Sequence, residues 1–284
     1  MSAQRLGQHF LEDTDVINTI IAAADLSSED TVLEVGPGRG ALTGHLVEQA
    51  GRVLLLEFDE DLCNRLAQKY ASADNVRVLN VDARDFGSDV DPWTRETDYK
   101  VVANLPYYAA SPITRNFLES TRKPTSMVIM IQREVANDMS AKPDDMSLLS
   151  LAIQIYSTAE HVVDAPPECF NPPPKVHSTV IKLTPTSETQ ITFESEDDFF
   201  TLARSGFKSP RKQLHNSLSD GLFIPLDDAR NLVEKTGFES SRRPSTLSLS
   251  DWQILYDVWV EAGRPLQVKG SVRRKRQNRQ NKTP

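Results

Sequence analysis

Cysteine is scarce in this chain, which contains two, Cys63 and Cys169, among 284 residues. They are far apart and form no C-x-x-C pair, so the sequence predicts neither a disulfide framework nor a zinc site, and no metal is expected. Long hydrophobic runs are also missing, because the longest, such as MVIMI at 127–131, fall well short of the roughly 20 residues that cross a bilayer. No apolar segment preceded by positive charge opens the chain, so no secretory signal is expected. We therefore predict a cytoplasmic protein that does not bind membranes.

An overall excess of basic residues is absent too, since 32 Lys and Arg stand against 40 Asp and Glu, a net charge of −8. The charge is uneven, however. Residues 187–284 hold 16 basic and 13 acidic residues, a net of +3, which leaves a net of −11 for the preceding part. Residues 264–284 carry eight basic residues and no acidic one. Such a tail could contact phosphates or could simply keep the terminus soluble, and charge alone does not decide between them.

What the sequence does contain is an alternation of apolar, β-branched segments with helix-like segments from residue 31 onward. This pattern is typical of a mostly parallel sheet with crossover helices. Amphipathic helices are predicted between the strands and before the first one, where Asp13 or Thr14 is the expected N-cap. The predicted strands are TVLEV (31–35), RVLLLEF (52–58), VRVLNV (76–81), KVVAN (100–104), SMVIMIQ (126–132), HVVDA (161–165) and STVIKLT (178–184).

The strand pattern ends near residue 185. Helical segments are predicted after it, and Pro210 is expected in the first turn of one of them. We therefore predict an α/β domain at 1–187, a small helical domain at 188–264 and a basic, disordered tail at 265–284.

A glycine-rich turn follows the first predicted strand, in VLEVGPGRGAL (32–42). Glycine at 36 and 38 lets a ligand approach the backbone closely, but NAD, FAD and S-adenosylmethionine all bind such turns. Glu57 at the end of the next strand can accept hydrogen bonds from ribose hydroxyls, which favours an adenosine-containing cofactor. Asp82 at the end of the third strand can accept from an adenine amino group, although alone it would be a turn cap.

The segment NLPYY (104–108) ends the fourth strand, at the same edge of the sheet. An exocyclic amino group such as N6 of adenine is a poor nucleophile, because its lone pair is delocalised into the ring. If the Asn104 side-chain carbonyl and the backbone carbonyl of Leu105 or Pro106 accept its two N–H bonds, the lone pair is directed at a methyl donor without a strong base. Tyr107 can stack on a base that has been flipped out of its helix.

Six motifs together make the chain resemble the rRNA adenine N6,N6-dimethyltransferases, from about residue 6 to residue 263. They are LGQHFL (6–11), EVGPGRGALT (34–43), LEFDEDL (56–62), VDARDF (81–86), ANLPYY (103–108) and PPECFNPPPKVHSTVIKL (166–183). The resemblance implies a Rossmann-like, seven-stranded class I methyltransferase sheet with a small all-α C-terminal domain, and S-adenosyl-L-methionine as the cofactor. It assigns cofactor binding to His9, Leu11, Gly36, Gly38, Glu57, Asp82 and Asn104. It assigns catalysis to Asn104, Leu105, Pro106, Tyr107 and Phe170, with Phe170 opposite Tyr107 on the target base.

The segments PPPKV, FKSPRKQLHNSL (207–218) and GFESSRRPSTLSLSDW (237–252) resemble the branch that acts on two adjacent adenines near the 3′ end of small-subunit rRNA. The other branch acts on one adenine of large-subunit rRNA. The small-subunit branch implies rRNA within a pre-ribosomal particle as the partner of a monomeric enzyme. It also implies RNA binding by the helical domain, through Lys208, Arg211 and Lys212.

Two segments depart from the family pattern. The chain has Pro210-Arg211-Lys212 where a double arginine followed by lysine is usual, and Met146-Ser147-Leu148-Leu149-Ser150 where Y-G-x-L-S is common. These changes motivate one alternative, a ribosome-assembly factor with secondary or lost catalysis. A large-subunit rRNA methyltransferase is a second, and an NAD-dependent oxidoreductase, resting on the glycine turn and Glu57 alone, is a remote third.

Overall fold

The computed structural model describes residues 9–88 and 90–266, which fall into two compact units. One unit comprises the chain up to Ser140 together with Ala152–Glu188, and the other comprises Ala141–Leu151 together with the chain from Thr189 onward. The prediction of one continuous domain at 1–187 is therefore wrong for Ala141–Leu151. This segment joins the helical unit because the backbone N–H groups of Asp144 and Met146 both donate to the carbonyl of Ser245, at 2.8 and 3.1 Å. The predicted tail from residue 267 onward, and residues 6–8 of the LGQHFL motif, lie outside the described residues.

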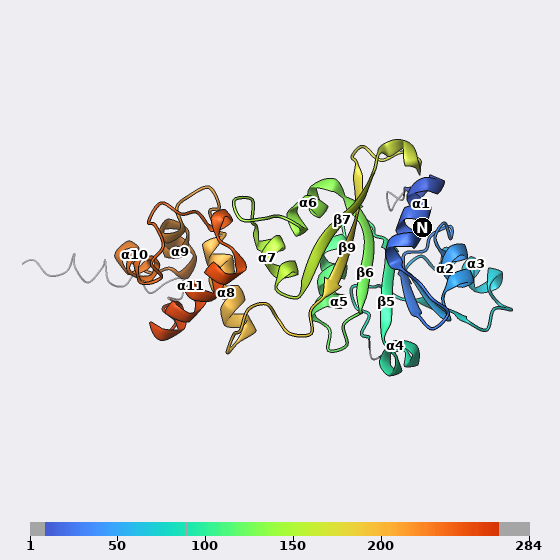
Figure 1. The fold of residues 1–284 in the computed structure, drawn as a ribbon, viewed down its shortest axis with the longest axis horizontal. Helices are drawn as coiled ribbons and strands as arrows, with labels where there is room; N and C mark the ends of the chain where they lie inside the picture. The colour runs from blue at the N-terminus through green and yellow to red at the C-terminus, as the bar shows by residue number, and fades with distance from the viewer. Residues whose placement is uncertain (1–8, 89, 267–284) are drawn as a thin grey trace, which may run out of the picture. The chain divides into compact units, whose positions relative to one another are not determined.

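The first unit is built on a seven-stranded sheet with the strand order β4-β3-β2-β5-β6-β9-β7 (Figure 1). Neighbouring strands from β4 to β6 are parallel, whereas β9 is antiparallel to both β6 and β7. All seven strands match predicted segments, but β7 begins at Ser157, earlier than predicted, because its polar first half pairs with β9 as an edge strand. The strands are β2 (Thr31–Val35), β3 (Arg52–Glu57), β4 (Val76–Asn80), β5 (Tyr99–Asn104), β6 (Ser126–Gln132), β7 (Ser157–Ala165) and β9 (Ser178–Pro185).

A hydrophobic core joins the sheet to the N-terminal helices. Ile20 of α1 and Leu46 of α2 are buried with Val53, Val102 and Val128 of the sheet. Asp13 is the N-cap of α1, as predicted, and its side chain accepts from the Val16 N–H at 2.9 Å. The helices of this unit are α1 (Thr14–Ala24), α2 (Thr43–Gln49), α3 (Glu60–Lys69), α4 (Pro92–Glu96), α5 (Ala110–Glu119) and α6 (Arg133–Met139), and α7 (Leu148–Gln154) crosses the boundary between the units.

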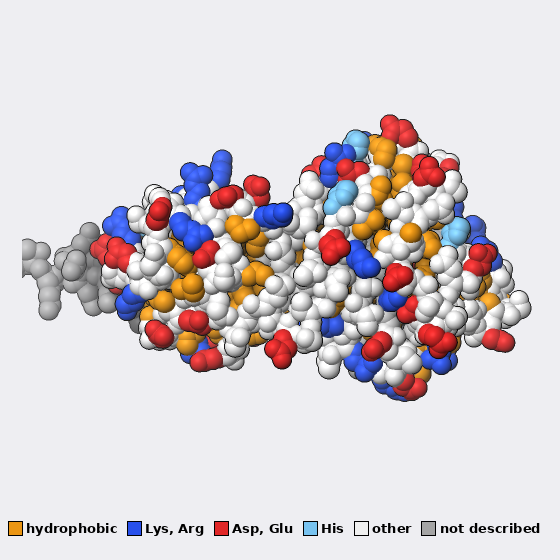
Figure 2. Space-filling model, viewed as in Figure 1, with side chains coloured by type: hydrophobic (Ala, Val, Ile, Leu, Met, Phe, Trp, Pro, Cys, Tyr) orange, Lys and Arg blue, Asp and Glu red, His pale blue; other side chains and the backbone are white. Residues whose placement is uncertain are grey.

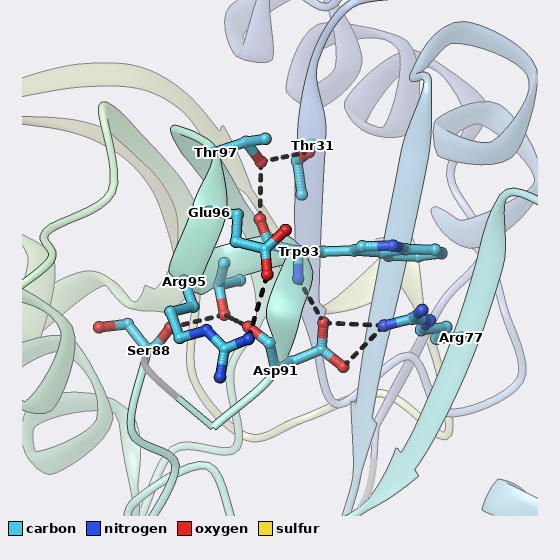
Figure 3. A network of polar contacts seen from close by, with 9 residues as sticks. Thr31, Arg77, Ser88, Asp91, Trp93, Arg95, Glu96 and Thr97 are labelled. Atoms are coloured by element: carbon cyan, nitrogen blue, oxygen red, sulfur yellow. Dashed lines mark hydrogen bonds and ion pairs between the residues drawn. The ribbon is translucent and has the colours of Figure 1, made fainter.

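A polar network fixes the connection between β4 and β5 at the end of the sheet where β5 begins (Figure 3). Asp91 caps α4 by accepting from the Trp93 N–H at 2.8 Å, and it pairs with Arg77 of β4 at 3.3 Å. The Arg77 guanidinium lies over the indole ring of Trp93, 4.1 Å from the ring centroid. The Thr31 and Thr97 hydroxyls lie 3.1 Å apart and join this connection to β2. Because this network occupies the amino ends of the strands, the carboxyl ends remain for a ligand site.

A second, two-stranded sheet joins distant parts of the chain, and nothing in the sequence predicted it. β1 (Phe10–Leu11) pairs antiparallel with β8 (Phe170–Asn171), with Leu11 opposite Phe170. The backbone N–H of Glu12 also donates to the Cys169 carbonyl at 2.8 Å. The pairing brings the end of the LGQHFL motif, Phe10–Leu11, beside the segment that contains Phe170.

The second unit is helical around an aromatic core. Trp252 and Trp259 of α11 are 0% and 1% exposed, which makes both packing residues. Helix α9 begins at Leu214, so the prediction of Pro210 in a first helical turn is wrong. Pro210 instead lies in a turn that the Lys212 N–H closes on the Ser209 carbonyl at 2.9 Å, where proline suits the second position. The helices are α8 (Glu196–Gly206), α9 (Leu214–Leu222), α10 (Leu226–Lys235) and α11 (Leu249–Glu261). In both units, no described helix is long and apolar enough to span a bilayer.

Candidate active site

A cavity of about 440 Å³ lies in the first unit, at the carboxyl ends of β2, β3 and β5. The cavity collects residues from segments more than 150 positions apart, from the N-terminal strand β1 to β8. Every residue predicted to bind the cofactor or to take part in catalysis lines it. These residues are His9, Leu11, Gly36, Gly38, Glu57, Asp82, Asn104, Leu105, Pro106, Tyr107 and Phe170.

The glycine turn forms one wall of the cavity. Gly36 and Gly38 have φ angles of +65° and +56°, which other L-residues rarely adopt. A Cβ at Gly38 would also lie 3.3 Å from the ring of Phe10, so the turn accommodates β1 closely. The guanidinium of Arg39 lies over the same Phe10 ring, 4.0 Å from its centroid. The turn therefore offers bare backbone to a ligand on one side and holds β1 on the other.

Glu57 lies at the end of β3 and is 4% exposed. One carboxylate oxygen accepts from the Gly38 N–H at 3.0 Å, and the other accepts from the Asp59 N–H at 2.9 Å. Burial raises the pKa of Glu57, and these two hydrogen bonds oppose the rise. A carboxylate has about four acceptor positions, so Glu57 can accept further hydrogen bonds from a ligand.

Glu34 is a buried acid in the cavity wall that the sequence interpretation missed. It lies in β2, is 2% exposed, and accepts a hydrogen bond from the Thr43 hydroxyl at 2.7 Å. Burial raises its pKa to about 8, with a smaller contribution from the charge of Glu57. The signal was present in the sequence, because Glu34 comes two residues before Gly36, but its burial depends on the packed sheet.

Asp82 lies beyond the end of β4, and Arg84 contacts both of its oxygens. The shortest distance between a guanidinium nitrogen and the carboxylate is 2.5 Å. This hydrogen-bonded pair lowers the pKa of Asp82, so the carboxyl group is ionised at neutral pH. Asp82 also acts as a turn cap, since it accepts from the Arg84 backbone N–H at 2.9 Å.

The Asn104–Tyr107 loop follows β5 directly. The Leu105 N–H donates to the Met130 carbonyl at 3.0 Å, which fixes the loop to β6. The Pro106 carbonyl accepts from the Ala109 N–H at 2.9 Å and closes a tight turn. The Tyr107 hydroxyl lies 2.8 Å from the Ser178 hydroxyl, and burial raises the Tyr107 pKa. The loop is therefore held at three points around the amide of Asn104.

Aromatic rings surround the loop. The ring of Tyr107 stacks with His9 at 6.1 Å between centroids, and Phe170 lines the same cavity while being only 4% exposed. Phe58 and Tyr108 also line the cavity but are 59% and 63% exposed, which places their rings at its rim. The sequence interpretation gave no role to Phe58. His9 is anchored through Nδ1, 2.7 Å from the Pro172 carbonyl.

Lys208, Arg211 and Lys212 lie in the helical unit, in or next to the turn between α8 and α9. Lys208 donates to the Asp220 carbonyl and lies 4.7 Å from the Phe223 ring centroid, whereas Lys212 pairs with the Asp220 carboxylate at 3.5 Å. Arg211 is exposed and has no hydrogen bond or ion pair to another described residue. Acidic and basic side chains are interspersed on the visible face of this unit (Figure 2). Among the described residues, no group of three or more His, Cys, Asp or Glu could hold a metal ion.

Comparison with known proteins shows the family of the chain. Residues 2–251 match the family model "Ribosomal RNA adenine dimethylase". Two proteins named ribosomal RNA small subunit methyltransferase A are similar to the chain: that of Dehalococcoides mccartyi is 41% identical over 90% of this chain and 88% of its own length, and that of Alkaliphilus oremlandii is 37% identical over 89% and 90%.

Solved structures agree in fold. A dimethyladenosine transferase from Plasmodium falciparum superimposes with a TM-score of 0.77 at 26% identity, covering 90% of this chain and 98% of that one. The 23S rRNA methyltransferase ErmE shares the fold with a TM-score of 0.68 at 23% identity, covering 88% of this chain and 98% of that one. The predicted class I methyltransferase fold is confirmed. So is the prediction of an enzyme that takes methyl groups from S-adenosylmethionine, because the chain belongs to the ribosomal RNA adenine dimethylase family.

Proposed function

We propose that this protein transfers methyl groups from S-adenosylmethionine to N6 of two adjacent adenosines near the 3′ end of small-subunit rRNA, two groups per base. The observation that carries the proposal is a single cavity shared by the glycine turn, Glu57, Asp82 and the Asn104–Tyr107 loop. The similarity of the chain to small-subunit methyltransferases, over about 90% of the length of this chain, favours small-subunit rRNA over large-subunit rRNA as the substrate. We further propose that it acts in small-subunit biogenesis, as a cytoplasmic monomer on a pre-ribosomal particle.

The residues of the cavity suit S-adenosylmethionine. The bare backbone of Gly36 and Gly38 leaves room that a side chain would fill, and Glu57 retains acceptor positions for ribose hydroxyls. Asp82 would accept from the adenine amino group, and the exposed ring of Phe58 offers that base an apolar surface. His9 and Leu11 would close the site from β1. When bound there, the cofactor supplies an electrophilic methyl group.

The catalytic loop would supply preorganised acceptors to the target amino group. The amide of Asn104 can accept one N–H bond. The Leu105 carbonyl suits the other better than the Pro106 carbonyl, which already accepts from Ala109. Because the loop is fixed to β6 and to Ser178, little reorganisation accompanies the reaction. Tyr107 would stack on the flipped base, with Phe170 as the opposite wall.

In the helical unit, Arg211 is the best candidate for a phosphate contact, because it is exposed and unpaired among the described residues. Lys208 and Lys212 would first have to release the carbonyl and the carboxylate of Asp220. This cost weakens the RNA contacts predicted for the two lysines and leaves the residues of the cavity unaffected. The family match, by contrast, argues against an NAD-dependent oxidoreductase.

The proposal is tested by incubating unmethylated small subunits with the protein and S-adenosylmethionine, followed by mass spectrometry of the nucleosides. We expect N6,N6-dimethyladenosine at two adjacent positions, and none with an Asn104→Ala variant. If the wild-type protein binds the particle but forms no dimethyladenosine, catalysis on this substrate is refuted. Rescue of subunit maturation by a catalytically dead variant would support the assembly-factor alternative.

A further inference from the structure

Most of the acceptor capacity of the Asp82 carboxylate is taken up by one neighbour, Arg84. Oδ1 accepts from the Arg84 backbone N–H at 2.9 Å and from Nε at 3.0 Å. Oδ2 accepts from the same Nε at 3.0 Å and from a terminal guanidinium nitrogen at 2.5 Å. Three N–H groups of Arg84 therefore reach the carboxylate, because the single Nε–H is shared between both oxygens. A carboxylate offers about four acceptor positions in all, so Arg84 takes up most of them.

This occupancy conflicts with the role proposed for Asp82. An adenine amino group that donates to Asp82 needs an acceptor position, and the guanidinium of Arg84 contacts both oxygens that could provide one. The bidentate contact is also of the charge-assisted kind, which is stronger than a neutral hydrogen bond. The amino group of the cofactor must therefore compete with Arg84 for the same oxygens.

The two side chains differ in where they can go. Asp82 lines the cavity and its side chain is 18% exposed, whereas the side chain of Arg84 is 48% exposed and does not line the cavity. Among the described residues Arg84 has no other hydrogen-bond partner, so its guanidinium can leave for solvent. Asp82 stays in place when this happens, because the Arg84 backbone N–H still holds Oδ1.

We propose that Arg84 competes with the adenine amino group of the cofactor for the carboxylate of Asp82, and that the amino group displaces the Arg84 guanidinium when the cofactor binds. Arg84 thereby lowers cofactor affinity and does so selectively for ligands that carry the amino group. The inference rests on the proposed contact between Asp82 and adenine.

The test measures binding by calorimetry, with S-adenosylhomocysteine as the probe because it lacks the positive sulfonium charge. A second probe is its 6-deamino analogue, in which hydrogen replaces the amino group of adenine. For Arg84→Met we expect S-adenosylhomocysteine to bind roughly two- to fivefold more tightly, since an exposed ion pair has a modest strength. Binding of the deamino analogue should not change. Arg95→Met is the matched control, because Arg95 is also exposed and paired, with Glu96 at 3.0 Å.

Weaker binding of S-adenosylhomocysteine by Arg84→Met would overturn the inference, because Arg84 would then support Asp82. An equal change for both probes would overturn it too, since the effect would not depend on the amino group. Binding of the same two probes to Asp82→Asn tests separately whether Asp82 contacts the adenine amino group, as the proposed function requires. If Asp82→Asn discriminates between the two probes as the wild type does, Asp82 does not contact the adenine amino group at all.

Discussion

The backbone N–H of Gly38 donates to the carboxylate of Glu57 at 3.0 Å, so the glycine turn after β2 is joined to the end of β3. The contact fixes two parts of the cavity wall to each other before any ligand binds. Glu57 is only 4% exposed, so a substitution that changes its charge or its shape is expected to disturb the cavity wall.

Glu57→Gln should therefore weaken cofactor binding by about 10- to 100-fold, because hydrogen bonds to charged groups contribute about 1.5–3 kcal/mol. The glutamine has one acceptor oxygen, and its NH₂ group would face a backbone N–H. Calorimetric titration with S-adenosylmethionine measures the effect. Glu48→Gln on the exposed side of α2 is the control, and an equal loss in both variants would mean that negative charge alone matters.

Asn104→Ala should abolish methyl transfer while leaving cofactor affinity within a few-fold of wild type. Its amide is expected to hold the target nitrogen, whereas the glycine turn, Glu57 and Asp82 supply most of the proposed contacts with the cofactor. Single-turnover transfer and calorimetric binding of S-adenosylmethionine are measured on the same preparation. Equal loss of both would show that Asn104 supports the fold of the cavity instead.

Substitutions at Tyr107 should separate its ring from its hydroxyl. Tyr107→Phe removes only the 2.8 Å contact with Ser178 and should cost about 1 kcal/mol of stability. Tyr107→Ala also removes the stacking face, which contributes about 1–3 kcal/mol per base, so transfer should fall by a further factor of roughly 10 to 100. Thermal unfolding and single-turnover rates measure the two effects. A Phe variant as slow as the Ala variant would contradict the stacking role.

The buried acid Glu34 predicts a pH dependence of stability. Its pKa rises from an ordinary 4.5 to about 8 in the folded protein, so the native state holds a proton that the unfolded chain releases. The free energy of unfolding should therefore fall as pH rises from about 4.5 to 8. Glu34→Gln removes this loss and should be more stable than wild type at pH 9 by roughly 2–5 kcal/mol, at about 1.4 kcal/mol per pKa unit.

Urea unfolding of Glu34→Gln and wild type at pH 5 and pH 9 tests this sign. At pH 5 the two proteins should differ little, because Glu34 is protonated in the folded wild type. Thr43 can still donate to the glutamine carbonyl. A stability difference that is the same at both pH values would contradict the raised pKa.

Gly221→Ala should destabilise the helical unit. A Cβ at this position would lie 2.4 Å from Cα of Ser205 and 2.7 Å from its carbonyl oxygen, so the backbones of α8 and α9 would have to separate. We expect a loss of about 1–3 kcal/mol and weaker RNA binding, with cofactor binding retained. Gly44→Ala in α2 is the control, because its Cβ would meet nothing within 4 Å. Parallel loss of cofactor and RNA binding would show that the units do not unfold separately.

Much of the sheet was predictable, because strands such as β3 are buried on both faces and read as continuous Val and Leu runs. The residues at the strand ends, Glu57, Asp82 and Asn104, were placed correctly on one cavity, since parallel strands share their carboxyl edge. The prediction for Pro210 was wrong because proline suits a β-turn and the first turn of a helix equally well.

What the sequence could not predict depends on contacts between distant segments. The ladder between β1 and β8 has two residues on each strand, too short for any periodicity. The pair between Asp82 and Arg84 is local, but only the folded turn shows that the guanidinium covers both oxygens. The His9 ring beside Tyr107 likewise follows from that ladder and not from its own neighbours in sequence.

The ladder between β1 and β8 has a consequence for turnover. Each methyl transfer consumes one cofactor molecule, so dimethylation of two bases requires repeated exchange of spent cofactor for fresh. Opening the site at β1 breaks a ladder of two residue pairs, the 2.7 Å contact of His9 with Pro172 and the packing of Phe10 against the glycine turn, while the seven-stranded sheet stays intact. We therefore expect the exit of spent cofactor to proceed past β1, at a rate set by how firmly this short strand is attached.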